Sequence, residues 1–178
     1  MQKTTIDNIY KWNIYLYLLT VLLLSALHHF LYELLPSDIV ATFSPKGESL
    51  AEHTKIVFYP VLFWWSVTFL AFRKAKALDA TKWFTASFIS AILSVGLLVA
   101  LYSTIFFGFG IENDNFVLHI LIELLSLGLA GWIGHHYFKF AQRRLWLLLT
   151  LGIVCIVVAV LMIVFTFVSV EAPIFMGN

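Results

Sequence analysis

Five long apolar segments constrain what this chain can fold into more than any other feature of its sequence. They cover residues 13–35, 55–72, 84–107, 115–137 and 145–168. A helix needs about 20 mostly apolar residues to cross roughly 30 Å of hydrocarbon. Only 12% of the 178 residues are charged and 61% are hydrophobic, which excludes a water-soluble fold, because soluble domains carry about a quarter charged residues. The sequence therefore predicts an all-α integral membrane bundle of five transmembrane helices, a single domain over residues 1–178 in the lipid bilayer.

The basic residues predict how this bundle is oriented. Nine of the eleven precede the first span or lie between the second and third or the fourth and fifth: Lys3, Lys11, Arg73, Lys74, Lys76, Lys82, Lys139, Arg143 and Arg144. Only Lys46 and Lys55 fall on the other side. Short basic loops stay in the cytoplasm, so we expect a cytoplasmic N-terminus and an extracytoplasmic C-terminus in a prokaryotic cytoplasmic (inner) membrane. The basic residues form no single patch, so we expect no nucleic-acid partner.

Proline and serine residues mark the expected helix limits on the outer side. Pro36 cannot continue a helical hydrogen-bond ladder and is expected to end the first helix. Ser44 followed by Pro45 has the pattern of an N-cap and a first helical position. We therefore expect the second helix to begin near Pro45, with an amphipathic extension over residues 44–54 at the membrane surface.

Small residues recur at four-residue spacing in the third and fourth spans. The two sets are Ala86, Ser90 and Ser94, and Ser126, Ala130 and Gly134. Such stripes let helix backbones approach closely in lipid. They favour packing within the bundle, with a homo-oligomer interface as the alternative.

Glutamate and histidine residues occur together in three stretches within or next to these apolar segments. His29 and Glu33 are four residues apart, His119 and Glu123 repeat that spacing, and Glu48, Glu52 and His53 form the third group. Ionisable side chains at membrane depth are costly, so they pair, face a cavity or carry out chemistry. With the first helix running outward and the second and fourth running inward, a rise of about 1.5 Å per residue places all three groups in the outer leaflet. The sequence predicts an outward-facing polar site there.

Histidine and carboxylate are a common ligand set for zinc, iron or manganese, and helical bundles build metal sites from such inward-facing side chains. We expect a divalent metal, zinc in particular, with the ligands His29, Glu33, His53 and His119. Glu48, Ser49, Tyr32 and Tyr102 are expected to complete the pocket. His28 points about 100° away from His29 around the helix and is expected to stay outside the ligand set.

If the site is catalytic, metal-assisted hydrolysis of a lipid-borne or membrane-adjacent substrate is the simplest mechanism. The metal would lower the pKa of a bound water, and Glu52 or Glu123 would act as the general base.

Three other interpretations remain open. The same residues suit a proton- or cation-coupled transporter or channel, although between Glu123 and His135 the fourth span offers only Ser126 and Trp132 as polar side chains. The small size suits an accessory structural subunit of a membrane complex. Each pair of histidine and glutamate could also be a hydrogen bond that pins two helices.

Three stretches of the sequence resemble a family of small multispan prokaryotic membrane proteins of unknown function. They are residues 29–33 (HFLYE), residues 43–55 (FSPKGESLAEHTK), and residues 165–167 (FTF) followed by 173–175 (PIF). The resemblance implies a characteristic set of His29, Glu33, Glu48, Ser49, Glu52, His53 and Lys55. The sequence departs from the family pattern at Gly47, where asparagine is expected, and at residues 168–170. His119 and Glu123 lie outside the pattern, and the resemblance implies no reaction.

Overall fold

Four long apolar helices dominate the computed structural model, which describes residues 2–74, 78–111 and 115–168. Within its first helix, side chains are described from Lys11 onward, that of Trp12 excepted. The helices long and apolar enough to cross a membrane are α4 (Leu50–Phe72), α5 with its continuation η1 (Ala80–Gly108), α6 (Phe116–Phe140) and α7 (Leu145–Phe167). The described residues are helical and contain no strand. The chain is therefore a helical protein of the multipass membrane type.

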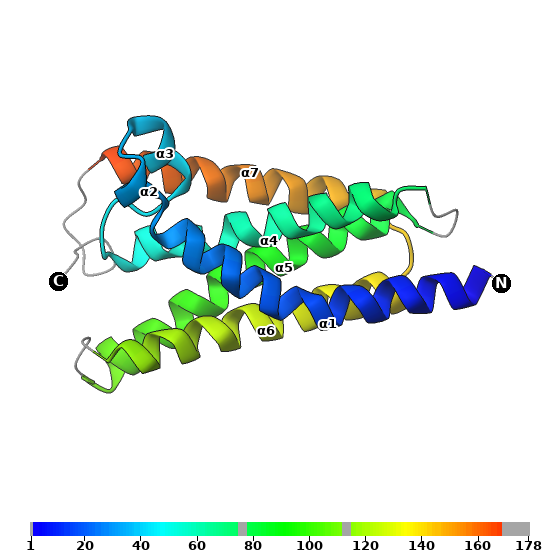
Figure 1. The fold of residues 1–178 in the computed structure, drawn as a ribbon, viewed down its shortest axis with the longest axis horizontal. Coiled ribbons are helices and arrows are strands. Elements are labelled where there is room, and N and C mark those ends of the chain that lie inside the picture. The colour runs from blue at the N-terminus through cyan, green and yellow to red at the C-terminus, as the bar shows by residue number, and fades with distance from the viewer. Residues whose placement is uncertain (1, 75–77, 112–114, 169–178) are drawn as a thin grey trace.

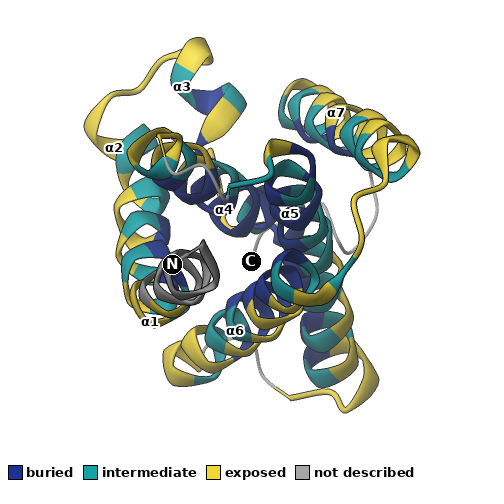
Figure 2. Cartoon of the chain, turned by 90° about the vertical axis from the view of Figure 1, so that its right-hand side faces the viewer, coloured by how far each residue is buried: buried dark blue, intermediate teal, exposed yellow. Residues whose placement is uncertain are grey.

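The first helix, α1 (Gln2–His29), is as long as these four, and its described apolar part covers Asn13–His29. It packs against α4 and α6, whereas α5 packs against α4, α6 and α7 (Figures 1 and 2). Exposed apolar side chains occur along the whole length of α7, as expected for a helix that faces hydrocarbon. The basic residue Lys76, the side chain of Lys3 and the tail residues 173–175 lie outside the described part of the chain.

The small residues of the third and fourth spans pack α5 against α6, which confirms the packing prediction. Both sets are buried. A Cβ on Gly134 would lie only 2.8 Å from the backbone oxygen of Ala86. The helices approach this closely because glycine stands at this position.

The first helix ends earlier than expected, and the prediction of one helix over residues 13–35 is wrong in its last turns. α1 stops at His29, and the short helices α2 (Leu31–Leu34) and α3 (Asp38–Phe43) follow it. The Ser44 hydroxyl donates to the carbonyl oxygen of His28 at 2.6 Å and accepts from the backbone N–H of Tyr32 at 3.2 Å. In a continuous helix these two backbone groups would bond to each other. Ser44 thus takes the place of a helical hydrogen bond and breaks the helix.

The expected start of the second helix near Pro45 is also wrong. α4 begins at Leu50, and its N-cap is Ser49, whose hydroxyl accepts from the backbone N–H of Glu52 at 3.2 Å. Ser44 instead follows α3 as its C-cap. Residues 44–49 are a non-helical loop, so only residues 50–54 of the expected extension over 44–54 are helical, as the first turn of α4.

Candidate metal centre

The helix break brings two histidines together where α1 ends and α4 begins. His29 is the last residue of α1, and His53 lies in the first turn of α4. Their Nε2 atoms are 3.2 Å apart. The carboxylate of Glu48, on the loop before α4, lies 3.4 Å from Nε2 of His53. One ligand atom from each of these three residues lies within 4.8 Å of the other two.

These separations match ligands of a single ion. Two zinc–nitrogen bonds of about 2.1 Å at a tetrahedral angle hold their nitrogens about 3.4 Å apart. The two imidazoles and the carboxylate could therefore hold one metal ion with small adjustments of their side chains. The same donor set suits zinc, iron and manganese.

The backbone fixes which nitrogen of His53 faces the cluster. Its Nδ1 lies 3.0 Å from the carbonyl oxygen of Ser49 and donates a hydrogen bond to it. The lone pair is then on Nε2, directed toward His29 and Glu48. A carbonyl partner of this kind is the usual orienting group behind a metal-binding histidine. Ser49 thus acts through its backbone, a role its side chain does not reveal.

A cavity of about 430 Å³ opens beside these three residues. Its polar lining comprises His29, Glu48, His53, Tyr102, His119 and Glu123. Ser25 on α1 donates a hydrogen bond to Oε1 of Glu123. Phe30, Phe116 and Ile120 also line the cavity and are 54%, 74% and 44% exposed. Their exposure places an apolar rim around one side of the cavity.

His119 lies on the cavity wall and is held there by aromatic rings. Its imidazole stacks on Phe106 with ring centroids 5.0 Å apart and an interplanar angle of 22°. Tyr102 contacts its ring at a centroid distance of 5.5 Å. Phe106 belongs to η1 (Ser103–Gly108), a π-helical segment, and such segments are frequent at functional sites. His119 thus faces the predicted site but stands outside the three-residue cluster.

Glu52 and Glu123 are the two predicted general bases, and they lie in different environments. Its Oε2 accepts from Nζ of Lys55 at 2.8 Å and from the backbone N–H of Lys46 at 2.6 Å. Its Oε1 accepts from the Thr166 hydroxyl on α7 at 3.0 Å. Lys55 is fully buried and also donates to the carbonyl oxygen of Ala41 on α3 at 2.8 Å. Glu52 therefore joins α4, α7 and the loop that carries Glu48.

The remaining predicted residues lie away from the cavity. Glu33 is exposed on α2, and the break at Phe30 separates it from the helical face of His29. Tyr32 is half-buried, and its backbone N–H bonds to Ser44. Sequence spacing singled out Glu33, but the loop brings Glu48 to His53 instead. The contact of Ser44 with α1 ends the helix at His29 and so explains why Glu33 does not share its face.

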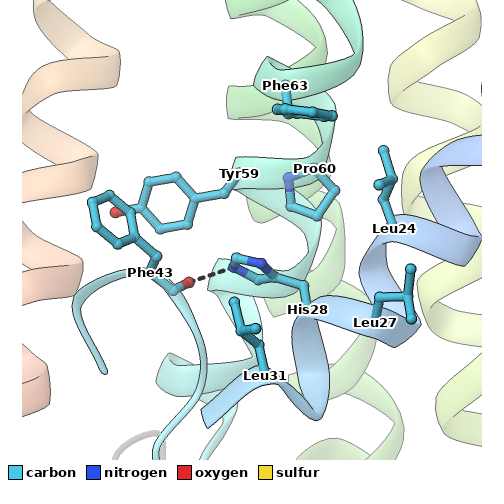
Figure 3. A pocket seen from close by; sticks show the side chains of 8 residues that line it. All are labelled: Leu24, Leu27, His28, Leu31, Phe43, Tyr59, Pro60 and Phe63. Carbon is cyan, nitrogen blue, oxygen red and sulfur yellow. Dashed lines mark hydrogen bonds between the residues drawn. The ribbon is translucent and has the colours of Figure 1, made fainter. Parts of the chain in front are cut away.

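His28 faces a second pocket, as its rotation around the helix suggested. This pocket has a volume of about 320 Å³ and is lined mainly by apolar side chains of α1, α3 and α4 (Figure 3). Nε2 of His28 donates to the carbonyl oxygen of Phe43 at 2.5 Å. Adjacent histidines at the end of α1 thus point into two separate cavities.

The fold is that of a helical protein of the multipass membrane type, and the side chains of His29, Glu48 and His53 form a group beside a cavity in it. A family model described as "Family of unknown function (DUF6512)" matches residues 1–178, so the chain belongs to that family. No curated protein and no solved structure matches the chain. The resemblance to a family of unknown function is confirmed, whereas the prokaryotic origin and the motif pattern stay predictions.

Proposed function

We propose that this protein binds one divalent metal ion, zinc in the first place, through His29, Glu48 and His53. The observation that carries the proposal is the spacing of the three ligand atoms, with the two Nε2 atoms 3.2 Å apart and the carboxylate 3.4 Å from one of them. Catalytic zinc sites commonly use three protein ligands and leave the fourth position to water or substrate. The cavity beside the cluster offers space for that fourth ligand.

We further propose that α1 is the fifth membrane span and that the metal site faces outward. α1 has 28 residues, which gives a length of about 42 Å. The charge distribution supports a cytoplasmic N-terminus and an extracytoplasmic C-terminus, since basic loops stay inside. His29 and the start of α4 then lie in the outer leaflet of the cytoplasmic membrane.

Hydrolysis of a membrane-borne substrate is the reaction we propose for this site. A metal ion would lower the pKa of a bound water and polarise the substrate. Glu123 is the better candidate for the general base because it lines the cavity, whereas Glu52 is engaged by Lys55, Lys46 and Thr166. The exposed apolar rim at Phe30, Phe116 and Ile120 supports entry of a lipid-borne substrate from the side.

Metal content of the purified protein tests the binding proposal. We expect one zinc ion per chain after purification without chelators, and loss of that ion in His29→Ala and in His53→Ala. His28→Ala is the matched control, because it removes the neighbouring histidine, which faces the other pocket. Zinc retained in both ligand variants, or lost equally in the control, would contradict the site.

Turnover of a fluorogenic fatty-acyl ester in mixed micelles tests the reaction separately. We expect zinc-dependent hydrolysis that Glu123→Gln abolishes while the zinc content stays unchanged. Glu33→Gln, an exposed carboxylate near the outer surface, serves as the control and should keep full activity. If zinc binds with no difference in turnover between the two variants, the metal site stands and the hydrolytic role of Glu123 is wrong.

A further inference from the structure

Side-chain contacts along α1 fix its register against both neighbouring helices. Against α4, His29 meets His53 and Tyr17 meets Trp64, whose ring centroids are 6.5 Å apart. Against α6, Ser25 meets Glu123, and Tyr17 packs on Gly131. The residue number falls along α1 as it rises along each partner, so both pairs are antiparallel. One turn along α1 therefore corresponds to one turn along α4 and one along α6.

This register defines an apolar layer one turn below Ser25 and Glu123. It contains Val21 of α1, Val61 of α4 and Leu127 of α6, and each of them is 0% exposed. All three belong to the same buried hydrophobic cluster. We call these three residues the collar. In this register the collar lies between the metal cavity and the other half of the three-helix interior.

Polar groups return below the collar. Asn13 and Tyr17, both 2% exposed, continue the buried face of α1, and Trp64 of α4 lies beside Tyr17. The amide nitrogen and oxygen of Asn13, the hydroxyl of Tyr17 and Nε1 of Trp64 are buried without a hydrogen-bond partner among the described residues. A fully buried tryptophan nearby is different, since Nε1 of Trp83 donates to the carbonyl oxygen of Trp65 at 2.8 Å.

Unpartnered polar groups at this depth point to bound water. Burying such a group without a hydrogen bond costs several kcal/mol, and in a bilayer neither lipid nor bulk water supplies the missing partner. Buried waters typically make about three hydrogen bonds to otherwise unsatisfied groups. Asn13 and Tyr17 follow each other by one turn, and Tyr17 contacts Trp64, so a few water molecules could satisfy all of them. No acidic residue stands at these two levels in the described chain, which favours water and protons over a dehydrated metal cation.

We propose that α1, α4 and α6 enclose a gated proton path that goes beyond the metal site. An inner chamber around Asn13, Tyr17 and Trp64 holds water, the outer cavity is open at its rim, and the collar closes the connection between them in this structure. Between Glu123 and His135, α6 carries only Ser126 and Trp132 as polar side chains. Polar atoms of α1 and α4 supply the further hydrogen-bonding groups that a proton path needs. Proton passage requires the collar to open or to become wet.

Hydroxyl-radical footprinting in native-like membranes tests the inner chamber. Radicals generated from bound water label the side chains that contact it, even when these are buried. We expect labelling of Tyr17 and Trp64 to exceed that of Trp83 severalfold, although all three are buried. Equal and low labelling of the three side chains would show a dry interior and overturn the proposal.

Proton flux into liposomes that contain a pH-sensitive dye tests the collar. Under a potassium diffusion potential we expect a severalfold higher flux for Val21→Thr than for wild type, because threonine keeps the shape of valine and adds a hydroxyl to the collar. Val67→Thr makes the same change on an exposed face of α4 and should leave the flux unchanged. Tyr17→Phe combined with Val21→Thr should lower the flux again.

A second pair of variants tests the collar even if Val21→Thr does not fold. Leu127→Ser changes the collar from α6, and Leu125→Ser is its control on the exposed face of the same helix. Higher flux in Leu127→Ser alone supports the gate. Flux at the level of the controls in both collar variants, with the proteins folded and reconstituted, overturns it whether or not zinc is bound.

Discussion

The backbone N–H of Lys46 donates a 2.6 Å hydrogen bond to Oε2 of Glu52 and so fastens the loop between α3 and α4 to the first turn of α4. Glu48 stands two residues further along this loop, where its carboxylate meets His53. Glu52 is therefore a positioning residue for the proposed ligand Glu48. Its own carboxylate has no place on the cavity wall described above.

Glu52→Gln should weaken zinc binding without removing a ligand. Loss of a group that orients a ligand typically lowers metal affinity about 10- to 100-fold, and we expect a decrease in this range in competition with a chelating dye. Thr166→Val is the control, because it removes the hydrogen bonds of this hydroxyl to the other carboxylate oxygen and to the carbonyl oxygen of Met162, and leaves the bond between Lys46 and Glu52 in place. Zinc affinity equal to wild type in Glu52→Gln would show that the loop holds Glu48 by itself.

The buried pair of Lys55 and Glu52 should be strongly coupled. Nζ of Lys55 is fully buried and lies 2.8 Å from Oε2 of Glu52. Breaking a buried ion pair from one side costs about 3–5 kcal/mol, and we expect Lys55→Met to lower the unfolding free energy by this amount in detergent. The double variant with Glu52→Gln should cost clearly less than the sum of the two single changes. Strict additivity in this double-mutant cycle would argue against a direct interaction.

Zinc binding should weaken as the pH falls. The nitrogen lone pair that binds a metal ion is the same one that takes up a proton, so His29 and His53 must be neutral to act as ligands. Acid favours the protonated rings, whose lone pair is no longer available to the metal, and so releases the ion. Chelator competition over a pH series should show tight binding at the alkaline end and release at the acid end. An affinity that does not change over this range would exclude histidine ligands.

Gly134→Ala should destabilise the contact between α5 and α6. The new Cβ would meet the backbone oxygen of Ala86 at 2.8 Å, and backbone atoms cannot move aside as a side-chain end can. Overpacking of this kind costs about 1–3 kcal/mol. Gly96→Ala on α5 meets no atom within 4 Å and should be neutral or stabilise the helix by up to about 1 kcal/mol. Thermal unfolding of the two variants in detergent compares them directly, and equal midpoints would contradict the close approach.

The four long helices were predictable because each apolar run is about as long as the segment that crosses a bilayer. The end of α1 was not, since it depends on a contact between residues 16 positions apart, the hydrogen bond from Ser44 to the carbonyl of His28. Local signals such as Pro36 mark where a helix must have ended. They do not reveal that the Ser44 hydroxyl binds the helical backbone groups of His28 and Tyr32 and ends the helix earlier.

The candidate site was predictable only in part, because it also depends on where α1 ends. Depth along the helices brought His29, His53, His119 and Glu123 to one cavity. Spacing alone then favoured Glu33, because residues four apart share a helical face, and the break after His29 removes that relation. The environment of Glu52 could not be predicted, because it depends on hydrogen bonds from the buried Lys55 and from Thr166 on α7.

The adjacent histidines at the end of α1 have a mechanical consequence. His28 and His29 share one rigid turn, yet one ring enters the apolar pocket and the other enters the polar cavity. A twist of that turn about the helix axis moves both rings together. Filling one compartment therefore biases the geometry of the other without any direct contact between their contents.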